Sequence, residues 1–457
     1  MENYFEYKGI VEGFYGREWS HGERKDIISF MGKKGYNLYI YAPKTDPFHR
    51  LRWKDPYPCG YDKEFAELIN LAAKNHVEFS AAVSPGLSLI YSHDEDLEKL
   101  FEKYTFFSNL GVKKFSLFFD DIPLSLNHMA DKEKYSSLAH AQSDFSNRLY
   151  DMLLKKDQDA KLIICPTLYH GTDPVQYHTL LGECLDLRID IMWTGEDVCS
   201  QKLLTENTKK ISHAFRRKVL YWDNFPVNDS LMCGELHIGP YESREKDLYL
   251  YSKGIVLNPM NQAYASMLVM ADAINYMNFP DSYDPVKSKE LSLKELYPDA
   301  YNGLLTLVHF NLKSPLHPQG FEKIKELALA FESEYSLRPV QAVEKYTILI
   351  EEHIQNLTSL EKTDEKLWKD ILPWVEELSA KLRIMLETFE LIKLSSDIQC
   401  EFPSKTNIQK VEEKVFYLER KISESIGFQT FSGGIDFLGF CLKYLLQAKS
   451  LLKLTQY

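Results

Sequence analysis

The stretch KKFSLFFDDIP (residues 113–123) contains an apolar run that ends in two adjacent aspartates. Its apolar residues predict a β-strand that is covered on both faces: Phe115, Leu117, Phe118 and Phe119. Asp120 and Asp121 follow this run without a spacer. Adjacent carboxylates repel each other and lose hydration when they are buried. A buried strand that ends in two carboxylates therefore needs an explanation. The residues at the ends of the other predicted strands provide it.

Seven other short apolar runs resemble this one, each with four to six residues that favour β-structure. Segments with the period of an amphipathic helix separate them. The eight runs cover residues 8–16, 36–44, 77–86, 113–121, 161–169, 188–195, 218–224 and 254–259. Strand and helix alternate about eight times in roughly 280 residues, which predicts an α/β fold of the TIM (β/α)8-barrel type. A doubly wound open sheet is the alternative, but no G-x-G-x-x-G or P-loop follows the first run.

The pattern changes after residue 284, where SYDPVKS (residues 282–288) forms a polar break and only helix-period segments follow. We therefore expect two domains. The first is a catalytic (β/α)8 barrel over residues 1–284, and the second is an all-α helical bundle over residues 285–457. Structural support or partner contact is the default role of such a bundle, and its faces could form a homodimer contact.

The composition is that of a soluble globular protein, with 44% hydrophobic residues, 26% charged residues and a formal net charge of −12. An acidic chain is a poor partner for phosphate backbones and anionic membranes, so we expect neither nucleic-acid nor membrane binding. The seven cysteines are scattered and form no C-x-x-C motif, which is typical of a reducing compartment. The sequence has no signal-peptide pattern and no segment apolar enough to cross a bilayer, so it predicts a cytoplasmic protein.

Polar and aromatic side chains collect at the ends of the predicted strands. In a parallel barrel these ends converge on one mouth, where enzymes of this fold keep their chemistry. Polar residues at one or two strand ends would only indicate solvent-exposed loops. Most of the ends together predict a functional site: Lys44, Asp120, Asp121, Tyr169, Trp193, Thr194, Trp222, Asp223, Asn224 and Asn258.

The tandem acids allow several interpretations. One acid could protonate a leaving oxygen while its neighbour steers a group of the substrate. The pair could instead cap the following helix, or Lys44 could be an ordinary ion-pair partner of the acids. A divalent metal is a further alternative, but the chain has no H-x-H or H-E-x-x-H, and His170 lacks an obvious ligand cluster. We therefore expect a site without metal or cofactor.

Eight motifs together resemble the O-GlcNAcase family, the β-N-acetylglucosaminidases of glycoside hydrolase family 84. The resemblance runs in order over about residues 8–285. The motifs are GIVEGFYGREW (9–19), YIYAPKTDPFHRLRW (39–53), FFDDI (118–122), CPTLYHGT (165–172), WTG (193–195), YWDNFPVND (221–229), IGPYESR (238–244) and LNPMNQ (257–262). The helical remainder is similar to the region that follows the barrel in this family, but more loosely.

The resemblance implies a retaining exo-β-N-acetylglucosaminidase that works by substrate-assisted catalysis. The 2-acetamido oxygen of the sugar attacks the anomeric carbon, and water then opens the resulting oxazoline. Asp120 would orient the acetamido N–H. Asp121 would be the general acid that releases the aglycone and then the base that activates water. No enzyme nucleophile is needed, which explains why two acids stand side by side.

The same resemblance implies the residues that bind the sugar. Tyr169 and Asn224 would hold the acetamido carbonyl and the oxazoline, and Asp229 and Asn258 would bind the outer ring hydroxyls. Trp222 would form an aromatic wall. The full substrate-binding set consists of Gly13, Tyr15, Lys44, Cys165, Tyr169, Trp193, Trp222, Asn224, Asp229 and Asn258.

The expected natural substrate is β-linked GlcNAc on Ser or Thr of a protein. Trimming of GlcNAc from a glycan or cell-wall fragment is the alternative within enzymes. A catalytically silent GlcNAc-binding protein is the alternative outside them, although a pure binder has no need of an acid at position 121. A metal-dependent hydrolase would lose its activity with a chelator.

Overall fold

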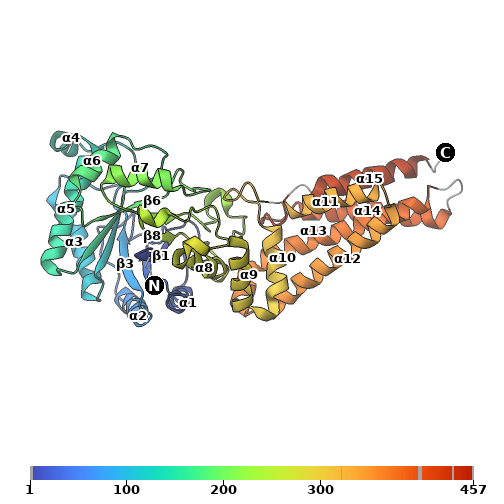
Figure 1. The fold of residues 1–457 in the computed structure, drawn as a ribbon, viewed down its shortest axis with the longest axis horizontal. Coiled ribbons are helices and arrows are strands. Elements are labelled where there is room, and N and C mark those ends of the chain that lie inside the picture. The colour runs from blue at the N-terminus through green and yellow to red at the C-terminus, as the bar shows by residue number, and fades with distance from the viewer. Residues whose placement is uncertain (1–3, 321, 400–403, 435–436, 455–457) are drawn as a thin grey trace. The chain divides into compact units, whose positions relative to one another are not determined.

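The computed structural model describes residues 4–320, 322–399, 404–434 and 437–454 (Figure 1). The remaining positions of the two predicted domains, 1–3, 321, 400–403, 435–436 and 455–457, lie outside the described residues. The chain divides into two compact units. The first unit comprises Met1–Ser230 and Pro240–Lys289, and the second comprises Leu231–Gly239 and Glu290–Tyr457.

The first unit is a closed barrel of eight parallel strands that pair in chain order. The last strand pairs with the first, with Tyr7 opposite Gly254, and this pairing closes the sheet. The predicted TIM-barrel fold is therefore confirmed. The strands are β1 (Tyr7–Glu12), β2 (Leu38–Tyr41), β3 (Glu78–Val83), β4 (Lys114–Phe118), β5 (Lys161–Cys165), β6 (Asp190–Trp193), β7 (Val219–Asp223) and β8 (Ser252–Leu257).

Helices lie on the outside of the strands (Figure 1). Local chemistry marks their ends, as α1 shows: Ser20 and Glu23 form a capping box at its start. Gly35 ends it in the left-handed region, at φ 87°, where a residue without Cβ is favoured. The outer helices are α1 (His21–Lys34), α2 (Tyr61–Lys74), α3 (Asp94–Asn109), α4 (Met129–Lys134), α5 (Leu138–Lys156), α6 (Gln176–Cys184), α7 (Thr205–Phe215) and α8 (Ala263–Asn278).

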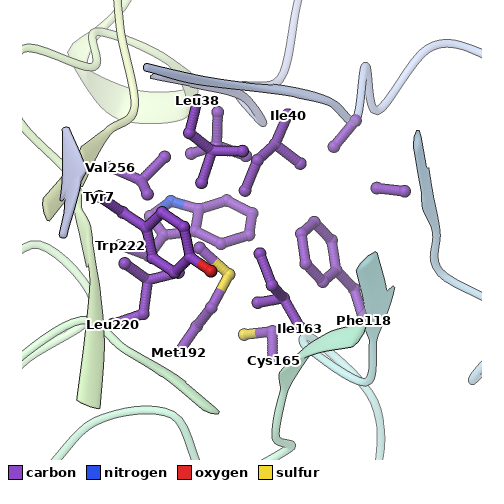
Figure 2. Close-up of a cluster of buried hydrophobic side chains, with 13 residues drawn as sticks. Tyr7, Leu38, Ile40, Phe118, Ile163, Cys165, Met192, Leu220, Trp222 and Val256 are labelled. Atoms are coloured by element: carbon purple, nitrogen blue, oxygen red, sulfur yellow. The ribbon is translucent and has the colours of Figure 1, made fainter. Parts of the chain in front are cut away.

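The barrel interior is filled by side chains from its strands (Figure 2). Because neighbouring residues of a strand point to opposite faces, alternate positions line this core. Near the carboxyl ends of the strands the core contains Phe118, Cys165 and Trp222, and Tyr169 packs against it. The ring centroids of Phe118 and Trp222 are 5.2 Å apart. This layer forms a rigid base for the polar groups above it.

The second unit is helical. Its helices are α10 (Tyr301–Phe310), α11 (Lys323–Tyr335), α12 (Pro339–Thr358), α13 (Glu365–Asp397), α14 (Lys405–Ser425) and α15 (Phe437–Leu454), and α9 (Pro285–Leu296) spans the junction of the units. Phe331 of α11 packs against Phe389 of α13 and Phe440 of α15. The indole Nε1 of Trp374 donates to the carbonyl of Gly234, which holds segment 231–239 against α13. In the part of the chain that is described, every helix is too short or too polar to cross a membrane.

Candidate active site

The tandem acids leave β4 at the mouth of the barrel. The N–H of Phe119 still donates to the carbonyl of Cys165, at 2.8 Å, so the sheet continues up to the first acid. Asp121 then adopts a φ of 55°, in the left-handed region that Asp and Asn tolerate better than most residues. The chain turns there, and the two carboxylates differ: Asp120 is buried and Asp121 is exposed.

Asp120 is held by a buried ion pair. The Nζ of Lys44, in the loop after β2, lies 2.5 Å from its Oδ2, and the Lys44 side chain is only 2% exposed. Burial alone would raise the pKa of Asp120, but the charge and hydrogen bond of Lys44 outweigh it and hold the pKa below its usual 3.8. Within the described residues, the buried Oδ1 of Asp120 has no hydrogen-bond partner. One oxygen of a carboxylate is thus fixed while the other is available as an acceptor.

Asp121 accepts a phenol hydroxyl on each oxygen. The Oη of Tyr15, in the loop after β1, donates to its Oδ2 at 2.7 Å. The Oη of Tyr169, in the loop after β5, donates to its Oδ1 at 2.8 Å. Burial raises the pKa of Tyr169, so this phenol keeps its proton at neutral pH. The two tyrosines fix the plane of a carboxylate that otherwise faces solvent.

Tyr15 connects several parts of the mouth. Its backbone N–H donates to Oδ2 of Asp229 at 2.7 Å, which anchors the loop after β1 to the loop after β7. The Nη1 of Arg50 donates to its Oη at 2.9 Å, and the Nζ of Lys44 lies 5.5 Å from its ring centroid. Burial raises the pKa of Asp229, although the Tyr15 N–H partly opposes this shift. Tyr15 therefore contacts both Asp121 and Asp229.

An amide network forms another wall of the mouth. The Oδ1 of Asn224 accepts from Nε1 of Trp222 at 2.9 Å and from Nδ2 of Asn258 at 2.8 Å. Its Nδ2 donates to the carbonyl of Val198 at 2.6 Å. The Oδ1 of Asn258 accepts from the N–H of Gly13 at 3.3 Å. These bonds lock the orientation of both amides and of the indole.

Glycine is required at position 13. A Cβ built there would lie 2.4 Å from Cζ2 of Trp222, far inside van der Waals contact. The indole therefore lies directly against the backbone of the loop after β1, and the Nζ of Lys44 is 5.6 Å from its ring centroid. Trp222 presents an aromatic surface beside the Lys44–Asp120 pair.

Cys165 lies at the base of the site and is 1% exposed. Burial raises the pKa of its thiol well above the usual range, and the charge of Asp120 adds to this effect. A thiol in this environment stays protonated and is a poor nucleophile. Cys165 is therefore a wall residue of the site.

The structure does not bring Trp193 to the site. Met192 points into the barrel core, so its neighbour Trp193 points to the opposite face, toward the helices. Its ring packs edge-on against His178 of α6 and Phe215 at the end of α7, with centroids 5.3 and 6.0 Å away. The prediction that Trp193 binds substrate is wrong for this reason. Alternation along β6 was the signal that separates it from Trp222.

Two groups at the mouth were missed by sequence reasoning. Arg50 lies within the motif YIYAPKTDPFHRLRW (39–53), six residues after Lys44. Its position in this polar loop was the only sequence signal for a place at the site. The carbonyl of Val198 carries no side-chain signal at all. Asp223, which the sequence analysis includes in the site, has a structural partner: it is buried and binds Nη2 of Arg244 at 2.6 Å. Asp223 therefore supports the end of β7 and does not face the mouth as a free carboxylate.

Across the described ranges, no three His, Cys, Asp or Glu side chains gather as metal ligands. The polar groups of the mouth instead pair with one another: a lysine with one acid, two phenols with the other, and two amides with an indole. Such a set offers hydrogen-bond donors, one free acceptor and an aromatic face to a polar ligand.

The sequence matches a family described as beta-N-acetylglucosaminidase over residues 8–309. Two curated relatives named Protein O-GlcNAcase, from Rattus norvegicus and Mus musculus, are each 35% identical over 257 residues. That stretch is 55% of this chain and 28% of each relative, so the chain spans less than a third of their length.

Solved structures extend the likeness to both units. A mutant of the Thermobaculum terrenum O-GlcNAc hydrolase superposes with a TM-score of 0.92 at 32% identity, over 99% of this chain and 97% of the other. The structure of CpGH84B superposes with a TM-score of 0.83 at 24% identity, over 96% of this chain and 77% of the other, and shows the shared fold. Because the family match covers more than half of the sequence, and the motifs of the mouth lie within it, the chain belongs to the beta-N-acetylglucosaminidase family.

Proposed function

We propose that this protein is a retaining exo-β-N-acetylglucosaminidase that uses substrate-assisted catalysis. The observation that carries the proposal is the division of work between the tandem acids. Asp120 is buried, ionised by Lys44 and has one free acceptor oxygen, whereas Asp121 is exposed and is held by two phenols. The buried Asp120 is suited to accept a hydrogen bond from a fixed N–H of the substrate. The exposed Asp121 is suited to give a proton to a leaving group and to take one from water.

In the first step, the acetamido oxygen of the sugar attacks C1 while the bond between C1 and the aglycone oxygen breaks. Asp121 gives its proton to that oxygen. Oδ1 of Asp120 accepts the acetamido N–H and stabilises the positive charge that develops on the forming oxazoline. In the second step the Asp121 carboxylate takes a proton from water, the hydroxide attacks C1 from the opposite face to the oxazoline oxygen, and the acetamido group is restored. Configuration at C1 is retained.

The remaining groups of the mouth would bind the sugar. We assign Lys44 and the backbone at Gly13 to ring hydroxyls, and Asp229 with Asn258 to the outer hydroxyls. Trp222 supplies the aromatic wall. We assign Asn224 to the acetamido carbonyl and Cys165 to the methyl group. Tyr169 contacts the same acetamido group while its hydroxyl proton is donated to Asp121. Apart from Trp193, and from Tyr15, whose hydroxyl donates to Asp121, this is the set that the sequence predicts.

We further propose that the natural substrate is β-linked GlcNAc on Ser or Thr of proteins. The name of the Thermobaculum terrenum relative, an O-GlcNAc hydrolase that matches almost the whole chain, supports this choice. Release of GlcNAc from a glycan is the competing substrate. A GlcNAc-serine peptide and a β-linked GlcNAc disaccharide, compared at equal concentration, separate the two: a higher kcat/KM for the peptide is expected.

The basic activity is tested with an aryl β-N-acetylglucosaminide and the matching aryl β-glucoside, each with and without a chelator. We expect cleavage of the acetamido sugar only, because the glucoside lacks the internal nucleophile. The chelator should have no effect. Equal cleavage of both sugars would contradict the role of Asp120. Binding of GlcNAc without cleavage would indicate a recognition protein, and inhibition by the chelator would indicate a metal-dependent hydrolase.

Lys44→Met should move the acidic limb of the pH profile. Lys44 holds the pKa of Asp120 below 3.8, and burial raises it once that charge is gone. Activity needs the Asp120 carboxylate, so it is lost as pH falls through this pKa. We therefore expect the acidic limb of kcat/KM to shift to higher pH in the variant, in addition to a lower rate. A profile whose acidic limb is unchanged would show that Lys44 does not maintain the ionised form.

A further inference from the structure

Arg50 lies beside the site, and the mechanism above gives it no task. It is half-buried in the loop after β2. Its Nη1 donates to Oη of Tyr15 at 2.9 Å, and its guanidinium carbon lies 6.0 Å from the centroid of the Tyr15 ring. Tyr15 in turn donates to Oδ2 of Asp121. A chain of two hydrogen bonds thus joins Arg50 to the acid.

The direction of this chain follows from the donors available. A guanidinium has N–H donors and no acceptor, whereas a phenol has one proton and one oxygen. Once Arg50 donates to the Tyr15 oxygen, the phenol proton is left for Asp121. Burial raises the pKa of Tyr15 against the opposing charge of Lys44, so the proton is present at neutral pH. Arg50 therefore determines which way the Tyr15 hydroxyl points.

The consequence concerns the plane of the Asp121 carboxyl. Asp121 is exposed, so packing alone does not hold its side chain. Tyr169 fixes one oxygen and Tyr15 fixes the other. Without Arg50, the Tyr15 hydroxyl could rotate toward water, and one of the two contacts would be lost. A general acid that rotates is misaligned with the leaving oxygen.

We propose that Arg50 is a positioning residue for the general acid, acting through the hydroxyl of Tyr15. The proposal rests on the function proposed above. The other charged or titratable groups that face Asp121 are Lys44, Asp120, Tyr169 and Asp229, and they belong to the sugar site itself. Arg50 makes its hydrogen bond to the site through Tyr15. Its positive charge also acts on Asp120 and Asp121, and Arg50→Lys keeps that charge.

The test compares two substrates of different leaving group with the wild type and with Arg50→Met. Acid assistance matters most when the leaving alcohol is poor. For an alkyl β-N-acetylglucosaminide, we expect Arg50→Met to lower kcat by about 10-fold, a fraction of the 10²–10⁴-fold that a general acid supplies. For a nitrophenyl glycoside, which departs with little help, we expect less than about a 3-fold loss. KM should be nearly unchanged for both, because the proposal gives Arg50 no contact with the sugar.

A double-mutant cycle tests the route of the effect. Tyr15→Phe removes the hydroxyl and should reproduce the leaving-group dependence. Adding Arg50→Met to Tyr15→Phe should then cause no further loss, because the link is already gone. Arg50→Lys keeps a donor and a charge and should recover part of the activity. Additive losses in the double variant would overturn the proposal, since Arg50 would act by another path.

Arg52→Met provides the matched control. Arg52 lies two residues along the same loop, is exposed and pairs with Asp55, so its removal should leave both rates unchanged. Equal losses on both substrates with Arg50→Met, or a higher KM on both, would overturn the proposal and indicate loop disruption or substrate binding. A wild type inactive on both glycosides would instead overturn the proposed function, and this inference with it. The melting temperature of each variant excludes unfolding as the cause of a loss.

Discussion

Asp121→Asn is expected to lower kcat/KM for a GlcNAc-serine peptide by about 10³-fold, within the 10²–10⁴-fold range of general acid–base catalysis. The amide cannot give a proton to the serine oxygen, nor take one from water. Asparagine is the right replacement because it tolerates the φ of 55° and can still contact Tyr15 and Tyr169. The loss therefore reports chemistry and leaves the fold intact.

The size of this loss should depend on the leaving group. With a nitrophenyl glycoside the first step needs little acid, so the steady-state loss shrinks and slow attack of water on the oxazoline limits the rate. A burst of nitrophenol before the steady state would show this change of limiting step. Asp173→Asn is the matched control, because Asp173 is an exposed acid in the loop after β5 whose partner is the surface Lys210. If Asp121→Asn had an equal effect on both substrates, Asp121 would not be the proton donor.

Asp120→Asn is expected to lower kcat/KM by about 10²-fold or more for both kinds of substrate. Its task is to accept the acetamido N–H and to stabilise the charge on the oxazoline, and neither depends on the aglycone. The nitrophenyl and alkyl glycosides should therefore lose activity by similar factors, in contrast to Asp121→Asn. Fluorine on the acetyl methyl should also slow the wild type, because it makes the acetamido oxygen a weaker nucleophile. An unchanged rate with the fluorinated sugar would contradict substrate assistance.

Asp120→Asn should also affect stability, unlike Asp121→Asn. It leaves the ammonium of Lys44 buried without its counter-ion, and breaking such a pair costs about 3–5 kcal/mol. Urea unfolding of the two variants measures the difference. The Asp120→Asn, Lys44→Met double variant removes both charges and should regain part of the stability while staying inactive. Stability without activity in the double variant would separate the catalytic role of Asp120 from its structural one.

Much of the barrel could be predicted from short stretches of sequence. A run such as 113–121 has enough apolar and β-favouring residues to indicate a strand buried on both faces, and β4 spans Lys114–Phe118 within it. β4 ends at Phe118, and Asp121 then adopts a left-handed φ, a backbone detail that composition does not reveal. Closure of the barrel followed from the number of such runs and from their alternation with helices.

The site divides in a similar way. Because parallel strand ends converge on one face, chain order alone was sufficient to place Lys44, Asp120 and Asn258 at a common mouth. The same reasoning failed for Trp193, since a residue at a strand end can face the core or the helices, and Met192 occupies the inward position. Neighbouring residues of β6 point to opposite faces, so Met192 faces the barrel interior and Trp193 faces the helices.

What local sequence established was therefore the kind of fold, the tandem acids and the family motifs, because each depends on neighbouring residues or on their order. Folding was needed to tell the acids apart: Lys44 buries and ionises Asp120, while Tyr15 and Tyr169 hold Asp121 in solvent. It was also needed to join Arg50 to Tyr15, which lie 35 residues apart in the chain. Hydrogen-bond partners, burial and side-chain direction arise between segments that are distant in sequence, so they appear only when the strands close into a barrel.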